Sequence, residues 1–150
     1  MKVDVTTEAV INRARDEVAS YAGDPANAPQ WYANIDTVTW NTPPPMSVGS
    51  KLTFVARFMG RRLEYTYEIV EFVPGERLVM RTSQGPFPME TTYIWANAGP
   101  GKTRMTLRNH GEPSGFASIT APIMSSAMRR ANHKDLANLK TILERRSPQH

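Results

Sequence analysis

Apolar and polar residues alternate through the middle of the chain, over residues 50–109. One parity carries large apolar and aromatic side chains, as in Phe54, Ala56 and Phe58, while the intervening positions are mostly polar. A period of two places successive side chains on opposite faces of a strand, and turns rich in glycine and proline separate the runs. We therefore predict five consecutive strands, over residues 51–59, 62–73, 76–84, 87–97 and 102–110.

The N-terminal part of the chain predicts two more strands and two short helices. Alternating apolar residues indicate a strand over residues 2–11, and a less regular pattern indicates another over 34–41. Between them, Asn12 is expected to cap a helix that runs to about residue 22. Asp24, followed by proline, is expected to cap a second short helix that ends near Trp31.

The C-terminal part predicts one long helix. From Phe116 to Leu143, apolar residues fall mostly on one helical face, and a helix of about 28 residues would be about 42 Å long. This order predicts an α+β protein in which a curved, seven-stranded antiparallel sheet, two short helices and one long C-terminal helix enclose a cavity. We expect a single domain over residues 1–146 and a frayed tail over 147–150.

Strand parity and helix periodicity give a set of candidate ligand-binding residues. Its aliphatic members are simply explained as core, whereas its polar members need hydrogen-bond partners if they are buried. An apolar cavity with a few converging polar groups is the usual form of a small-molecule site. The candidates are Phe54, Phe58, Tyr65, Tyr67, Met80, Thr82, Thr91, Tyr93, Trp95, Met105, Leu107, Asn109, Phe116, Ile119, Ile123, Met124 and Met128.

Composition and charge narrow the classes of partner. The 150 residues carry a formal net charge of +4, and the sequence pI is near 9.6. The basic residues are scattered and no nucleic-acid-binding motif is present, so we expect no nucleic-acid partner. No apolar run approaches the ~20 residues that span a bilayer, and the N-terminus does not read as a signal peptide. We therefore expect a cytoplasmic protein, with its oligomeric state left open.

Candidates for catalysis are few. The chain has no cysteine, and its histidines and acidic residues show no metal-ligand spacing, so we predict neither a metal site nor a cofactor. Aldol-type ring closure needs only a shaped pocket and an acid/base pair. The candidates for such groups are Tyr67, Tyr93 and His110. His110 is expected near the mouth of the cavity, where the last strand meets a glycine-rich loop.

The arrangement of elements resembles the START-like superfamily, also called SRPBCC, which has the helix-grip fold and includes proteins described as polyketide cyclase/dehydrase-like. Residues 24–31, 67–78, 103–106 and 132–140 carry the resemblance. It implies a cavity for a hydrophobic or amphipathic small molecule, such as a lipid or a polyketide, bound for transport or sequestration. Two alternatives remain open, a polyketide aromatase/cyclase-like enzyme and a chaperone-activator-like protein-interaction module. The identity of the ligand is not indicated.

Overall fold

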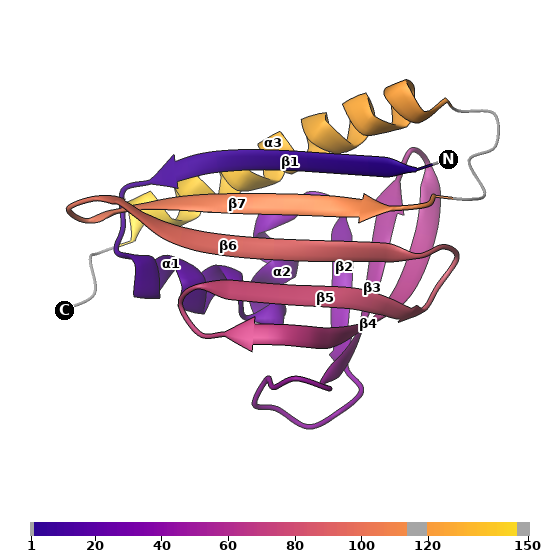
Figure 1. Cartoon of the computed structure of the whole chain (residues 1–150), viewed down its shortest axis with the longest axis horizontal. Helices are drawn as coiled ribbons and strands as arrows, with labels where there is room; N and C mark the ends of the chain where they lie inside the picture. The colour runs from indigo at the N-terminus through magenta and orange to yellow at the C-terminus, as the bar shows by residue number, and fades with distance from the viewer. Residues whose placement is uncertain (1, 114–119, 147–150) are drawn as a thin grey trace.

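The structure is a computed structural model that describes residues 2–113 and 120–146 (Figure 1). The long helix and most strands lie close to their predicted bounds. The elements in chain order are β1 (Val3–Ile11), α1 (Arg15–Ala22), the 3-10 helix η1 (Pro25–Asn27), α2 (Ala28–Trp31), β2 (Ile35–Trp40), β3 (Lys51–Phe58), β4 (Arg61–Val73), β5 (Arg77–Gln84), β6 (Met89–Gly99), β7 (Lys102–Gly111) and α3 (Ala121–Arg145).

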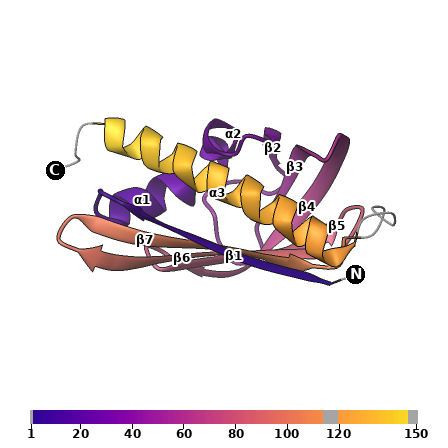
Figure 2. The same ribbon diagram turned by 90° about the horizontal axis from the view of Figure 1, so that it is seen from above.

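The strands form one seven-stranded antiparallel sheet in the order β1-β7-β6-β5-β4-β3-β2. Figure 2 shows that the sheet curls, and that α1, α2 and α3 all lie against one of its faces, which we call the inner face. The prediction of an α+β protein with a curved seven-stranded sheet and a long C-terminal helix is confirmed. Phe116 and Ile119, the proposed start of that helix, lie outside the described residues.

The short helices begin at local signals, one of which was predicted correctly. The Asp24 side chain accepts a hydrogen bond from the Ala26 N–H at 3.0 Å and caps the 3-10 helix that Pro25 begins. The prediction that Asn12 caps the first helix is wrong, because Ala14 is the N-cap. The backbone N–H of Asn12 instead donates to Glu144 Oε2 at 2.8 Å and ties the end of β1 to α3.

Two clusters of buried side chains hold the helices on the sheet. The larger lies under α1, α2 and the C-terminal half of α3 and includes Trp31 and Leu139, both fully buried. The smaller lies near the N-terminal half of α3 and includes Met124 and Tyr65. Burying one such large apolar side chain contributes about 1.5–3 kcal/mol. The two clusters hold both ends of α3 against the inner face.

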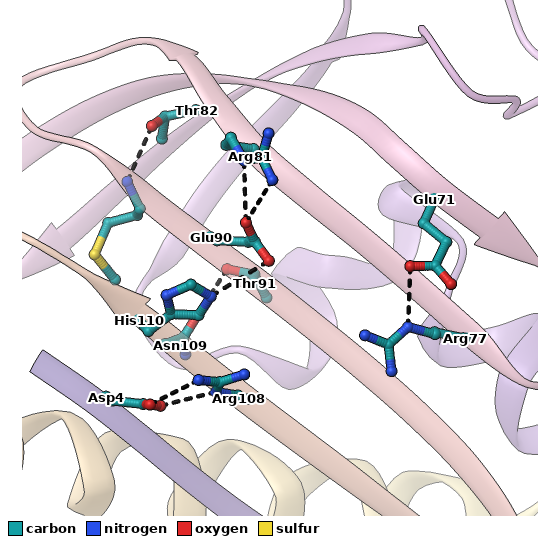
Figure 3. Close-up of polar contacts among 11 residues, drawn as sticks. Asp4, Glu71, Arg77, Arg81, Thr82, Glu90, Thr91, Arg108, Asn109 and His110 are labelled. Atoms are coloured by element: carbon teal, nitrogen blue, oxygen red, sulfur yellow. Dashed lines mark hydrogen bonds and ion pairs between the residues drawn. The ribbon is translucent and has the colours of Figure 1, made fainter.

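The outer face of the sheet is polar and carries cross-strand ion pairs. Figure 3 shows Arg108 with Asp4, Arg81 with Glu90, and Arg77 with Glu71, each pair joining two strands. Exposed pairs of this kind contribute about 0–1 kcal/mol each. The outer face is therefore a solvated surface whose charges are largely paired.

Candidate functional site

A cavity of about 170 Å³ lies between the inner face of the sheet, the end of α2 and α3. Most of its lining is apolar or aromatic. Ten of the residues predicted as ligand contacts line it: Phe54, Phe58, Tyr65, Tyr67, Met80, Thr91, Tyr93, Asn109, Met124 and Met128. Strand parity thus located the sheet wall of the cavity, although contact of these side chains with a ligand stays a prediction.

Four other candidates lie on the inner side or between strands but do not line this cavity. Met105 and Leu107 are fully buried in the core and Trp95 is nearly so, because the helices cover their part of the sheet. The Thr82 hydroxyl accepts a hydrogen bond from the Met89 N–H at 3.0 Å, as Figure 3 shows, and so holds the start of β6. The prediction that these residues face the cavity is wrong.

The prediction that Ile123 faces the cavity is also wrong, because its side chain is 58% exposed. Met124 and Met128, one helical turn apart, are the residues of this part of α3 that point inward. Ile123 is turned by about 100° from Met124 around the helix, which carries it out of the inward stripe.

His110 does not lie at the cavity. Its Nε2 is 3.3 Å from Glu90 Oε1, and Figure 3 places this pair among the charged residues of the outer face. The preceding residue, Asn109, faces inward and lines the cavity, so alternation directs His110 to the other side. The prediction that His110 sits at the cavity mouth is therefore wrong, whereas Tyr67 and Tyr93 both line the cavity.

Two tyrosines meet at one end of the cavity. The hydroxyl oxygens of Tyr32, the C-cap of α2, and Tyr93, on β6, are 2.5 Å apart and share a hydrogen bond. Burial raises the pKa of both phenols above the usual value near 10. Both side chains are thus neutral at pH 7 and act as hydrogen-bond donors and acceptors rather than as bases.

A second polar chain runs across the inner face. The Thr91 hydroxyl donates to Asn109 Oδ1 at 2.7 Å, and Tyr67 forms a hydrogen bond with the same hydroxyl. Burial raises the pKa of Tyr67 to about 12, and the bond to Thr91 offsets part of that rise. This chain links β4, β6 and β7 and places the Tyr67 phenol on the cavity wall.

Helix α3 contributes two buried polar residues that the sequence reasoning missed. Asp135 is 3% exposed, and its Oδ1 accepts the Ala33 N–H at 3.0 Å. Burial raises the pKa of this carboxyl to about 6, against the opposing effects of the Ala33 hydrogen bond and the Lys134 charge. Asn132 is 6% exposed, and its Nδ2 has no hydrogen-bond partner among the described residues. Both side chains line the cavity.

A helical signal for these two residues was present in the sequence. Positions 128, 132, 135, 136 and 139 follow the spacing of one inward face, and all five residues are buried. The segment 129–135 is rich in polar residues, a pattern typical of a solvated helical face, and His133 is indeed exposed whereas Asn132 and Asp135 are buried. Tyr32 and Asn34 also line the cavity, and they come from a segment whose approach depends on how α2 packs.

The described part of the chain offers neither a metal-binding cluster nor a membrane-spanning helix. No group of three or more histidine, cysteine, aspartate or glutamate side chains in residues 2–113 and 120–146 is arranged to hold a metal ion. None of the helices in the same residues is long and apolar enough to cross a bilayer.

Comparison with known proteins supports the family that the arrangement suggests. Residues 2–144 match the family described as polyketide cyclase / dehydrase and lipid transport. The chain belongs to this family. Members with this START-like, helix-grip architecture share the curved sheet and long C-terminal helix seen in Figures 1 and 2. A search of curated proteins gave no significant match.

Several solved structures of other proteins have the same fold as this family member. A START superfamily protein from Mycobacterium smegmatis is 14% identical, with a TM-score of 0.81 over 94% of this chain and 97% of that one. The Zhui aromatase/cyclase from Streptomyces sp. R1128 is 13% identical, with a TM-score of 0.78 over 97% and 96%. The major latex-like protein 151 of Panax ginseng is 15% identical, with a TM-score of 0.75 over 94% and 97%. At these identities the likeness shows the fold alone.

Proposed function

We propose that this family member binds a compact, mostly hydrophobic small molecule in the cavity between the sheet and α3. The observation that carries the proposal is the lining itself, in which aromatic and aliphatic side chains surround a few buried polar groups, including the Asn132 amide without a protein partner. Such a lining is typical of ligand sites. An ordinary core would satisfy or exclude a buried amide.

The size of the cavity favours a small ligand. A dry protein cavity of about 150 Å³ accommodates benzene, and this cavity measures about 170 Å³. A single ring or a short branched chain therefore fits the space as it stands. A long acyl chain or an extended polyketide would need the cavity to open further. We expect the first ligands found to be of the single-ring class.

The test is a binding measurement with apolar probes of that size. Titration calorimetry with toluene and indole is expected to show saturable binding, and both are expected to raise the melting temperature, since a ligand that binds only the folded state stabilises it. Absence of binding by every probe of this size would contradict the proposal.

A matched pair of variants tests whether the probes bind in the cavity or on the surface of the sheet. Ala56 lines the cavity on β3, whereas Val55 is the adjacent residue on the opposite face of the same strand. Ala56→Leu is expected to fill part of the cavity and weaken probe binding at least about tenfold, because the added methyl groups occupy the ligand's volume. Val55→Leu is expected to leave binding unchanged. Equal effects of the two substitutions would place the probes elsewhere.

One observation favours a second candidate, an aromatase/cyclase-like enzyme. The Asp135 carboxyl lines the cavity with a pKa raised to about 6, which suits a general base near neutral pH. One of the two neutral phenols, Tyr32 or Tyr93, would then donate a hydrogen bond to an enolate oxygen, since the other donates within the pair. A turnover assay with a poly-β-ketone substrate discriminates the two functions. Enzymatic turnover that Asp135→Asn abolishes would establish the second.

The third possibility raised by the sequence, a protein-interaction module, would be supported by a cavity filled by side chains. The inner face instead retains the cavity described above, so no observation favours this possibility over ligand binding.

A further inference from the structure

Three polar groups of the cavity wall come together around Asp135. Asn132 and Asp135 are three positions apart on α3, which places their Cβ atoms about 5–6 Å apart on one side of the helix, and both side chains line the cavity. The Tyr32–Tyr93 hydroxyl pair lies near enough that the charge of Asp135 contributes to the raised pKa of both phenols. A cluster of polar groups therefore lies at one end of the cavity, and apart from the Tyr67–Thr91–Asn109 chain most of the remaining lining is apolar or aromatic.

The hydrogen-bonding capacity of this polar end is only partly used by the described residues. The buried Asn132 Nδ2 has hydrogens to donate and no partner. Of the two tyrosine hydroxyls, one donates to the other, which leaves one hydroxyl hydrogen available. Asp135 takes one hydrogen bond, from Ala33 to Oδ1, so Oδ2 is available as an acceptor. At this end of the cavity, the described residues thus leave the Asn132 Nδ2 group and one tyrosine hydroxyl as donors, and Asp135 Oδ2 as an acceptor, for a ligand.

A hydroxyl group has the complementary capacity. Its oxygen accepts two hydrogen bonds and its hydrogen donates one. A carbonyl oxygen would leave Asp135 without a donor, an ammonium group would leave Asn132 without an acceptor, and a carboxylate would be repelled by Asp135. A water molecule could satisfy the same groups but would leave the apolar part of a cavity of about 170 Å³ unfilled.

We propose that the cavity selects a compact apolar molecule that carries one hydroxyl group, a phenol or a short alcohol, and that Asn132, Asp135 and the Tyr32–Tyr93 pair bind this hydroxyl. The proposal rests on the proposed function, since it names the class of molecule that the cavity takes. The apolar body of the ligand lies against Phe54, Tyr65 and the methionines of α3, and its hydroxyl points toward Asp135.

The decisive test compares p-cresol with p-xylene, which differ by a hydroxyl in place of a methyl group. Their affinities for the full-length protein are measured by titration calorimetry at about pH 8, where Asp135 is ionised. We expect p-cresol to bind at least about tenfold more tightly, because p-xylene leaves the buried polar groups without partners. Desolvation of the hydroxyl alone would favour p-xylene, so a preference for p-cresol reports the polar contacts. 4-Methylanisole, which cannot donate, is expected to bind no better than p-xylene.

Two variants test whether the preference for p-cresol arises from the polar groups around Asp135. In Asp135→Asn the amide retains the Ala33 contact through its oxygen but presents a donor to the ligand. In Asn132→Leu the unpartnered donor is removed. Each is expected to reduce the ratio of p-cresol to p-xylene affinity about tenfold while p-xylene binding persists. Asp16→Asn, on the exposed side of α1, is the charge-matched control and is expected to keep the wild-type ratio.

The outcomes separate this inference from the function on which it rests. Equal affinities for p-cresol and p-xylene, or an unchanged ratio in both α3 variants, would overturn the inference and leave the apolar binding function standing. Binding of neither compound would overturn both. Circular dichroism and the melting temperature confirm that each variant is folded. If Asp135→Asn fails to fold, Asn132→Leu decides the matter by itself, because it removes a buried group that has no protein partner.

Discussion

The hydroxyls of Tyr32 and Tyr93 are 2.5 Å apart and join the end of α2 to the inner face of β6. Next along the chain, the Ala33 N–H donates to Asp135 on α3. These two contacts tie a short helix, the sheet and the long helix together around one end of the cavity. The same groups therefore hold the cavity wall in place and supply its polar chemistry.

Removing either hydroxyl of the tyrosine pair is expected to lower the free energy of unfolding. Each single loss should be more than half of the loss caused by removing both hydroxyls. Tyr32→Phe and Tyr93→Phe should each lower the free energy of unfolding by about 1–2 kcal/mol, since each leaves the other buried hydroxyl with fewer partners. The double variant should lose less than the sum of the two, with a coupling of about 1 kcal/mol. Urea denaturation of the four proteins gives this cycle, and additive losses would show that the hydroxyls do not interact.

Asp135 is expected to make the protein less stable as pH rises. Its folded-state pKa, about 6, lies above the value of 3.8 for an unfolded aspartate carboxyl. The folded state therefore binds the proton more tightly, and stability is lost as pH rises from about 4 to 6, by up to about 3 kcal/mol in total. Asp135→Asn should be more stable than wild type above pH 7 by about 1–3 kcal/mol, with the difference shrinking toward pH 4.

The measurement is the free energy of unfolding of both proteins between about pH 4 and 8. Using the difference between the two removes the effect of the other carboxyls. Asp4, for example, has a pKa lowered by its hydrogen bond to Arg108 and contributes with the opposite sign. A difference that did not vary with pH would show that Asp135 titrates normally in the folded protein.

Asn132→Leu is expected to stabilise the protein in the absence of ligand. The side chain has nearly the same size, and the substitution removes a buried amide nitrogen that has no partner among the described residues. The expected gain is about 1 kcal/mol. Asn138→Leu is the matched control on the same helix, because Asn138 Nδ2 donates to the Trp31 carbonyl and its loss should destabilise. Thermal and urea unfolding measure both, and a destabilised Asn132→Leu would mean that the amide has a partner in solution.

Tyr67→Phe is expected to weaken binding of a hydroxylated probe without unfolding the protein. The phenol lies on the cavity wall and bonds to Thr91, whose own bond to Asn109 remains in the variant. We expect a loss of binding of about threefold to tenfold and a stability change of about 1 kcal/mol. Calorimetry with p-cresol tests this, and an unchanged affinity would exclude the Tyr67 hydroxyl as a ligand contact.

Gly111 is expected to tolerate no side chain. A Cβ atom there would overlap the Pro88 carbonyl oxygen and lie 2.6 Å from the Met89 sulfur. Gly111→Ala should therefore push β7 from the start of β6 at the cavity end of the sheet and cost about 1–3 kcal/mol. Gly60→Ala is the comparison, since its Cβ meets nothing within 4 Å and only its φ of +78° opposes substitution. Urea unfolding measures the stability of both variants. A smaller loss of stability in Gly111→Ala than in Gly60→Ala would show that a side chain at Gly111 is not crowded.

The sheet wall of the cavity was predictable because strand parity is a local property. Phe54, Tyr65 and Tyr93 face inward as their alternation requires. The same alternation excludes His110 once Asn109 is placed inward, but His110 was predicted at the junction of the last strand and a glycine-rich loop, where alternation was not applied. Strand β7 in fact continues to Gly111. Parity also cannot tell cavity from core, which is why Trp95 and Met105 were included.

The polar end was not predictable from local patterns alone. Asn132 and Asp135 fit the inward helical face, but polar residues among arginines are usually solvated, and only the position of α3 over the sheet shows that they are buried. Tyr32 reaches the cavity because α2 ends there and its hydroxyl meets Tyr93. These three residues come together through tertiary packing, which no single segment of the sequence encodes.

Strand β1 pairs along its whole length with β7, although paired residues such as Thr7 and Leu107 are 100 positions apart in the chain. During synthesis β1 therefore lacks its sheet partner until residues 102–111 have been made, and a pairing of this separation forms slowly. In that interval an unpaired apolar strand edge can form hydrogen bonds with other chains. The outward-facing positions of β1 carry Asp4, Thr6 and Glu8, with Val10 as the apolar exception. These polar residues make the unpaired strand a poor template for aggregation.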